Sequence, residues 1–232
     1  MAVAAREALE RQSKVRHDLR APLAVLLPLL SMMLDAGDLT DGQRDQLRTL
    51  ERNVQRLDGM ISSVAASGWF DCCAAPLDLR PVALGPLVEE RVAAQRLGGY
   101  DGPVLEAHVA AQAPDVLADR DRVRQILADL IDNAARFAPM SGPVLLAVEP
   151  AVDGRTVTLS VTDGGPGIPA DELPEVAGFG FRGSAARQLN VPGLGLGLWA
   201  SRRLAEQMGG GLVVDGRAGS GTTVALTLPA AG

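Results

Sequence analysis

The chain has 232 residues, of which 47% are hydrophobic and 3% aromatic, a composition that allows one large or two small domains and excludes a disordered chain. Its formal net charge of -6 argues against a nucleic-acid-binding surface, because phosphate backbones require clustered positive charge. No stretch approaches the roughly 20 apolar residues that span a bilayer, and no signal pattern begins the chain. We therefore expect a cytoplasmic chain without a membrane segment, alone or as the cytoplasmic part of a larger or membrane-bound protein.

The N-terminal part has the periodicity of two amphipathic helices. Apolar residues recur at spacings of three and four within residues 2–36 and again within 43–64, as one face of a helix requires. Turn and cap residues lie between them at 37–42. We predict a two-helix hairpin in a first domain, residues 1–67. One hairpin buries its apolar stripes poorly, so two copies are expected to form a homodimeric four-helix bundle.

A linker is predicted at 68–80, where proline and glycine interrupt the pattern, and a mixed α/β domain at 81–232. Within that domain the hydrophobic period alternates between those of helix and strand. Helices are predicted at 86–97, 118–137 and 198–208, and strands at 104–109, 144–148, 156–162, 211–214 and 222–228. The whole chain is therefore predicted to belong to the α+β class.

Asp163 directly follows a predicted apolar strand and opens the segment Asp-Gly-Gly-Pro-Gly-Ile. A carboxylate at a strand end can accept a hydrogen bond from an exocyclic amine, and glycines let the backbone approach a flat ligand. Taken alone, the segment is equally consistent with an ordinary turn.

Gly193, Gly195 and Gly197 lie just before the predicted helix at 198–208. Glycines with this spacing before a helix can cradle phosphate on free backbone N–H groups. The spacing is not that of a dinucleotide-binding fingerprint, and no Lys-Ser or Lys-Thr follows, as a Walker A loop requires. Taken alone, the segment is also consistent with a flexible loop.

Asp129, Asn133 and Arg136 fall at i, i+4 and i+7 of a predicted helix and so share one face. A carboxylate, an amide and a guanidinium suit a Mg²⁺–triphosphate complex, because Mg²⁺ prefers oxygen ligands and Arg pairs with phosphate. The alternative interpretation is a solvated polar face.

The order of these three motifs resembles the Bergerat ATP-binding fold shared by histidine kinases, gyrase-type ATPases and MutL proteins. The resemblance implies an α/β sandwich that binds ATP and Mg²⁺, with Asn133 as the metal ligand and Asp163 reading the adenine amine. Gly165 and Gly167 would line the adenine pocket, and the glycines at 193, 195 and 197 would anchor a mobile lid over the phosphates.

His17 opens the segment His-Asp-Leu-Arg-Ala-Pro-Leu on the first predicted helix. This segment resembles the phospho-acceptor box of histidine kinases, and the stretches 119–127 and 219–229 resemble their catalytic domain. A neutral imidazole is a good nucleophile, and Asp18 can orient it and accept its proton. The resemblance covers residues 13–229. It implies autophosphorylation of His17 from Mg-ATP and transfer to an aspartate of a response-regulator receiver domain.

Two positions depart from that family. Ala21 stands where a Thr or Asn usually positions water for dephosphorylating the response regulator, so we expect weak or no phosphatase activity. Asp129 stands where an Asn is usual, and its carboxylate would either tighten Mg²⁺ binding or repel the triphosphate.

The lid segment also departs from the family, because its phenylalanines are displaced within residues 178–183. Phe179 or Phe181 remains available to pin the lid. Arg182 and Arg187 are candidate phosphate contacts.

Two other functions stay open on the sequence. One is a non-catalytic ATP-binding signalling module that dimerises, and the other is a gyrase-like ATPase or a protein serine kinase of the same fold. The box at His17 argues against the second.

Overall fold

The computed structural model describes residues 25–26, 28–34, 39–40, 42–51, 54, 76–97, 102–138, 142–189, 191 and 193–232. The chain divides into two compact units, residues 1–76 with 192–194 and residues 77–191 with 195–232. Each is described by itself. Within the described ranges, no helix has both the length and the apolar character needed to cross a membrane.

Residues 28–34 and 42–51 of the first unit are helical, as predicted for the two arms of the hairpin. They meet in a small buried apolar cluster, and Arg44 Nη1 donates a 3.0 Å hydrogen bond to the carbonyl of Leu34. The cluster consists of Leu30, Leu47 and Val54.

The second of these helices begins with a reciprocal cap. The Gln43 N–H donates to Thr40 Oγ1 at 3.3 Å, while Gln43 Oε1 accepts from the Thr40 backbone N–H at 3.0 Å. Two backbone donors that a helix start leaves unpaired are thereby satisfied. The expected turn and cap at 37–42 is confirmed at Thr40.

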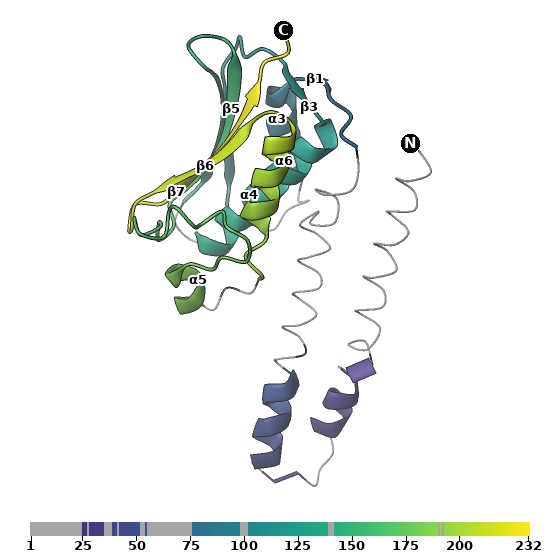
Figure 1. Cartoon of the computed structure of the whole chain (residues 1–232). Helices are drawn as coiled ribbons and strands as arrows, with labels where there is room; N and C mark the ends of the chain where they lie inside the picture. Colours follow the sequence, from purple (N-terminus) through teal and green to yellow (C-terminus); the bar gives the residue numbers. More distant parts are fainter. Residues whose placement is uncertain are drawn as a thin grey trace. The chain divides into compact units, whose positions relative to one another are not determined.

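A five-stranded sheet forms the centre of the second unit, in the order β2-β4-β5-β7-β6 (Figure 1). β2 pairs with β4 in parallel, and the remaining neighbours pair antiparallel. The strands are β2 (Leu105–Val109), β4 (Val144–Pro150), β5 (Thr156–Asp163), β6 (Gly211–Gly216) and β7 (Thr222–Pro229). The predicted strands are all present.

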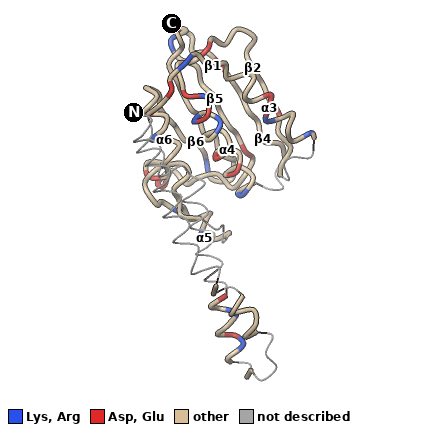
Figure 2. The backbone as a smooth tube through the Cα atoms, turned by 90° about the vertical axis from the view of Figure 1, so that its right-hand side faces the viewer, with Lys and Arg blue, Asp and Glu red and all other residues tan. Residues whose placement is uncertain are grey.

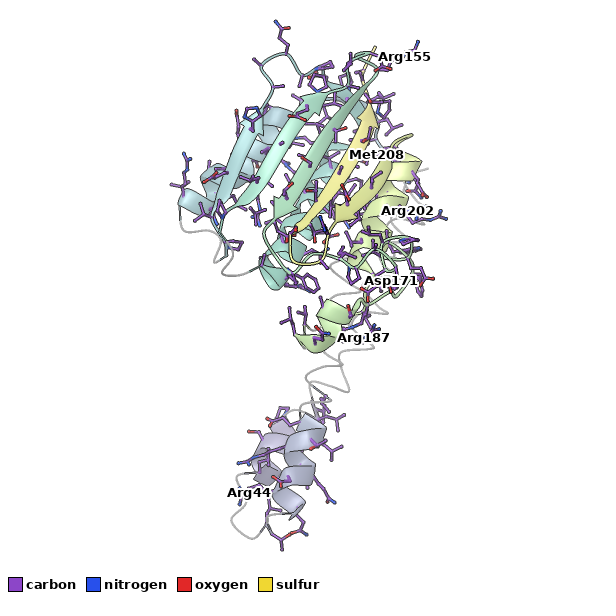
Figure 3. The ribbon with its side chains drawn as sticks, turned by 90° about the vertical axis from the view of Figure 1, so that its left-hand side faces the viewer. Arg44, Arg155, Asp171, Arg187, Arg202 and Met208 are labelled. Atoms are coloured by element: carbon purple, nitrogen blue, oxygen red, sulfur yellow. The ribbon has the colours of Figure 1, made fainter. Side chains whose placement is uncertain are left out.

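The helices α3 (Leu84–Arg96), α4 (Arg120–Phe137) and α6 (Gly197–Gln207) cover one face of this sheet. Its other face is turned to the viewer in Figure 3. The strands alternate accordingly: Val157 and Leu159 of β5 are fully buried, whereas Thr158 between them is only half-buried. Acidic and basic positions are interspersed over both layers (Figure 2). The α+β prediction is therefore confirmed.

Three short elements are not predicted from the sequence. β1 (Arg80–Val82) and β3 (Val116–Ala118) pair antiparallel as a separate small sheet, and α5 (Ser184–Gln188) lies inside the glycine-rich region. Each is too short to establish a hydrophobic period. β1 and β3 form because they pair with each other, although they lie far apart in the sequence.

Two predicted helix starts are wrong by two residues. α4 begins at Arg120 because residues 116–118 form β3 and the Asp119 carboxylate accepts N–H bonds from Asp121 and Arg122 at 3.1 and 3.2 Å. An aspartate in this position caps a helix. α3 begins at Leu84, two residues before the predicted Pro86, since proline is tolerated in a first turn.

Candidate functional site

α4 carries the first group of predicted site residues. Asn133 and Asp129 are half-buried and Arg136 is exposed. The helix packs its apolar side inward with Ile126, Leu130 and Ile131 fully buried. That packing leaves the face with Asp129 and Asn133 at the edge of the core, where polar side chains can reach a ligand.

α6 runs antiparallel to α4 (Figure 1). A Cβ placed on Gly197 would lie 3.8 Å from Asn133 Nδ2 and within 4 Å of no other atom of the described residues beyond its own helix and neighbours. At the opposite end, Val116 before α4 bridges Ala230, and Gly210 after α6 lies against the carbonyl of Thr227. Asn133 and the first residue of α6 are thus brought together, as the sequence predicts.

Asp163 ends β5 and is held by backbone donors. Its Oδ1 accepts the Gly165 N–H at 2.8 Å, and the N–H of Thr222 on β7 also donates to it. Burial raises the pKa of Asp163, and these two donors oppose that shift. The carboxyl group is therefore partly desolvated but oriented, which suits an acceptor of a ligand amine.

Gly165 and Gly167 lie in tight surroundings. A Cβ on Gly165 would meet Asp163 Oδ1 at 2.7 Å and the Phe137 carbonyl at 3.2 Å. Gly167 has a φ of 69°, and its Cβ would collide with the Arg217 carbonyl. Side chains at either place would displace the turn that positions Asp163.

The second glycine-rich segment is similarly constrained. Gly195 has a φ of 69°, and a Cβ there would collide with the carbonyl of Phe181. Gly193 has a φ of 145° and is grouped with the other unit. Gly195 therefore sets the close approach between the segment before α6 and the lid residues at 178–183.

The arginines of the lid have protein partners. Arg182 Nη2 donates to the Val191 carbonyl at 2.6 Å. Arg187, on α5 (Figure 3), lies 3.9 Å from Glu172 Oε1, and Glu172 also accepts the Ser184 N–H at the start of α5. Both arginines thus contact other residues of the same unit. Their predicted phosphate contacts stay predictions.

Phe179 contacts α6. Its ring lies 5.1 Å from that of Trp199, edge to face at 86°, a geometry that aromatic pairs favour. This contact supports the prediction that one of the displaced phenylalanines pins a lid, which stays a prediction. The sequence gives no signal for Trp199, Glu172 or Thr222. Each acquires its role only through a contact with a residue that the fold brings close.

Asp129 is a partly buried carboxyl group with one unpartnered oxygen among the described residues. Its Oδ2 is buried with no hydrogen-bond partner among the described residues. Burial is the main cause that raises its pKa from 3.8 to about 7, with a further rise from Asp132 and an opposing effect of Arg136. A carboxyl group in this state lacks a compensating positive charge.

The side-chain oxygens of this helix face fit a Mg²⁺ ion that is bound jointly by the protein and a nucleotide. Mg²⁺ is usually bound through one or two protein oxygens plus substrate phosphates, and the Asn133 amide and the unpartnered Asp129 Oδ2 are such oxygens. Among the described residues, no group of three or more His, Cys, Asp or Glu side chains could hold a metal by itself. A cation here would therefore depend on ligand phosphates.

His17, Asp18 and Ala21 lie outside the described residues. Their predicted roles as acceptor, proton acceptor and missing phosphatase side chain stay predictions. His108, the second histidine of the chain, is exposed on β2.

Comparison with known families divides the chain in two. Residues 118–232 match the family described as histidine kinase-, DNA gyrase B- and HSP90-like ATPases. Residues 10–70 match the His Kinase A (phospho-acceptor) domain.

Curated relatives include two sensor proteins. The virulence sensor protein BvgS of Bordetella bronchiseptica is 35% identical over 221 residues, which cover 91% of this chain and 17% of the relative. The aerobic respiration control sensor protein ArcB of Escherichia coli is 30% identical over 241 residues, covering 97% of this chain and 30% of the relative. The chain thus spans less than a third of either relative.

Solved structures agree with these matches. Full-length ShkA in complex with AMPPNP superposes with a TM-score of 0.64 at 28% identity, covering 96% of this chain and 46% of that one. The mycobacterial sensor histidine kinase MprB superposes with a TM-score of 0.53 at 30% identity, covering 65% of this chain and 98% of that one.

Proposed function

Because this chain belongs to the sensor histidine kinases of two-component systems, we propose that it is an ATP-dependent kinase core that phosphorylates its own His17. It then passes the phosphate to an aspartate of a response-regulator receiver domain. The observation that carries the proposal is the convergence of Asn133, Gly197 and the Asp163 turn in the second unit, in a chain whose residues 10–70 match the phospho-acceptor family.

The nucleotide is held by groups with distinct tasks. Asp163 accepts a hydrogen bond from the adenine amine, and Gly165 and Gly167 leave room for the base. The glycines at 193, 195 and 197 bring the lid and the first N–H groups of α6 to the phosphates. Asn133 holds Mg²⁺, with Asp129 and Arg136 on the same helix face; when bound, Mg²⁺ neutralises charge on the phosphates.

Transfer is an in-line displacement. An imidazole nitrogen of His17 attacks the γ-phosphorus, the bond to the β–γ bridging oxygen breaks, and ADP leaves with that electron pair. Asp18 accepts the proton that the imidazole loses. Catalysis in this class of reaction is mostly positioning and charge stabilisation, so the second unit must reach His17 through the predicted linker at 68–80.

The unit that acts is a homodimer, with the hairpin of residues 1–67 forming the four-helix bundle and residues 81–232 binding ATP. The exposed apolar residues of the hairpin support dimerisation, since a solitary hairpin leaves them in water. The cytoplasmic location stays a prediction.

Weak phosphatase activity toward the response regulator is the finer part of the proposal. It is supported only by Ala21, whose methyl group cannot form a hydrogen bond with a water molecule. Dephosphorylation of the regulator that disappears on His17→Ala or Asp18→Ala but persists in Asp163→Asn would contradict it.

The proposal is tested by incubating the chain with Mg²⁺ and ATP labelled at the γ-phosphate. We expect an acid-labile, base-stable protein label that is absent from His17→Ala and from the nucleotide-site variant Asp163→Asn. His108→Ala is the matched control and should keep the label, because His108 is exposed on a strand of the other unit.

The alternatives predict other results. ATP hydrolysis without protein labelling would favour a gyrase-like ATPase, and acid-stable label would favour a serine kinase. Nucleotide binding with neither hydrolysis nor label would favour a non-catalytic signalling module.

A further inference from the structure

The seam between α4 and α6 contains buried polar atoms with no partner among the described residues. They are Gln125 Nε2, Asp129 Oδ2 and Ser201 Oγ. Because the helices run antiparallel and meet at Asn133 and Gly197, one turn along each brings Asp129 and Ser201 to the same level. Unpartnered buried polar groups are uncommon in folded proteins and call for a physical explanation.

Asp129 is the one ionisable member of this set. The amide of Gln125 and the hydroxyl of Ser201 are neutral, so neither can balance a carboxylate. The charges that act on it are the exposed Asp132, which is repulsive, and the exposed Arg136, which is attractive but outweighed by burial. As a carboxylate, Asp129 therefore has a buried oxygen that no hydrogen-bond donor among the described residues balances.

A triphosphate beside Asn133 would bring further negative charge to this place. At the effective dielectric constants of partly buried sites, like charges about 6 Å apart weaken binding by tenfold or more. A divalent cation between them reverses the sign of the interaction, because carboxylate and phosphate oxygens are both ligands that Mg²⁺ prefers. An asparagine would neither repel the phosphates nor gain as much from the cation.

We infer that Asp129 couples nucleotide binding to the cation, repelling metal-free nucleotide and binding the Mg²⁺ complex, so that this chain selects Mg-nucleotide over free nucleotide. The inference rests on the proposed nucleotide site and deepens it. The sequence leaves two alternatives for this carboxylate, namely repulsion of the triphosphate and tighter binding of Mg²⁺. On this inference both occur, the first without Mg²⁺ and the second with it.

The test is a direct binding measurement that needs no turnover. The dissociation constant of AMPPNP is measured by isothermal titration calorimetry on the full chain at pH 8, with saturating Mg²⁺ and with EDTA. Asp129→Asn removes the charge at constant shape, and Asp129→Ala is a second variant that removes the oxygens. Asp132→Asn is the matched control, since it removes an exposed charge from the same helix.

We expect removal of Mg²⁺ to weaken binding to the wild type and to Asp132→Asn about tenfold more than to either Asp129 variant. An equal loss in wild type and Asp129→Asn, or the same change in Asp132→Asn, would overturn the inference and leave the proposed function intact. Failure of the wild type to bind AMPPNP even with Mg²⁺ would overturn the nucleotide site, and the inference with it.

Discussion

Asp163 and Asp129 are both partly buried carboxyl groups, but their surroundings differ. Asp163 is held by N–H groups of Gly165 and Thr222, which favour its charged form against the effect of burial. Asp129 has a buried oxygen with no such donor among the residues that the structure describes, and its pKa rises to about 7. One site is thus prepared for a hydrogen-bond donor and the other for a cation.

The raised pKa of Asp129 predicts a pH-dependent stability. A carboxyl group whose pKa rises on folding from 3.8 to about 7 stabilises the fold below pH 3.8, and this contribution is lost as pH rises through 7. Asp129→Asn should therefore raise the unfolding free energy at pH 8 by roughly 4 kcal/mol and change it little at pH 4. Urea denaturation followed by circular dichroism measures both values.

The control for that experiment is Asp132→Asn, which should reduce the pH dependence only slightly, because burial rather than Asp132 is the main cause of the raised pKa of Asp129. A difference in unfolding free energy between Asp129→Asn and the wild type that is the same at pH 4 and at pH 8 would contradict the assigned burial of Asp129.

At the scale of elements, the lid and α6 are held by a backbone contact and a ring contact. Gly195 permits the approach to the Phe181 carbonyl, and Phe179 packs on Trp199. The glycine-rich pattern could be predicted to matter, because glycines before a helix are a recognisable signal. The contact between the Phe179 and Trp199 rings could not be predicted, because no hydrophobic period in the sequence links these two positions.

Gly195→Ala should weaken AMPPNP binding by about tenfold or more, because the new methyl group collides with the Phe181 carbonyl and forces the lid to shift. Calorimetry at saturating Mg²⁺ measures the effect. Gly154→Ala is the matched control: its φ of 67° is almost the same, but a Cβ there meets nothing within 4 Å. Equal loss of affinity in both variants would mean that the collision has no role.

Thr40→Ala should destabilise the hairpin by about 1 kcal/mol, since it removes the hydroxyl that bonds both the Gln43 N–H and Gln43 Oε1 in the cap. Amide hydrogen exchange over residues 42–46 should become faster. Thr49→Ala serves for comparison, because the Thr49 hydroxyl donates to the Asp45 carbonyl within the helix, and exchange near the cap should not change. Unchanged protection in Thr40→Ala would show that the cap contributes nothing.

At the scale of the whole molecule, the described hairpin residues carry large side chains that the chain itself leaves in water. The set comprises Val25, Leu26, Leu29, Met32, Met33 and Leu50. A clustered apolar surface of this kind usually marks an interface, and a second hairpin offers a matching surface by symmetry.

Leu29→Glu should shift the chain from dimer to monomer, because Leu29 is 48% exposed in the single chain and a charge would be buried in the bundle. Sedimentation equilibrium measures the association, and AMPPNP binding should persist. Leu97→Glu, at a leucine of the other unit that is 87% exposed, should remain dimeric. A wild-type chain that is monomeric at all concentrations would contradict the bundle.

The long elements and the order of the site motifs can be predicted from the sequence alone. α4 and the strands of the sheet follow from hydrophobic periods, and Asp163, Asn133 and Gly197 follow from local signals of strand end, helix face and helix start. The short strands β1 and β3 and the Phe179–Trp199 contact were decided only by the tertiary structure, because each depends on a partner far along the chain. The same holds for Asp129. Its residue type is plain in the sequence, but the burial of its Oδ2 without a partner among the described residues, which raises its pKa, depends on the tertiary packing around α4.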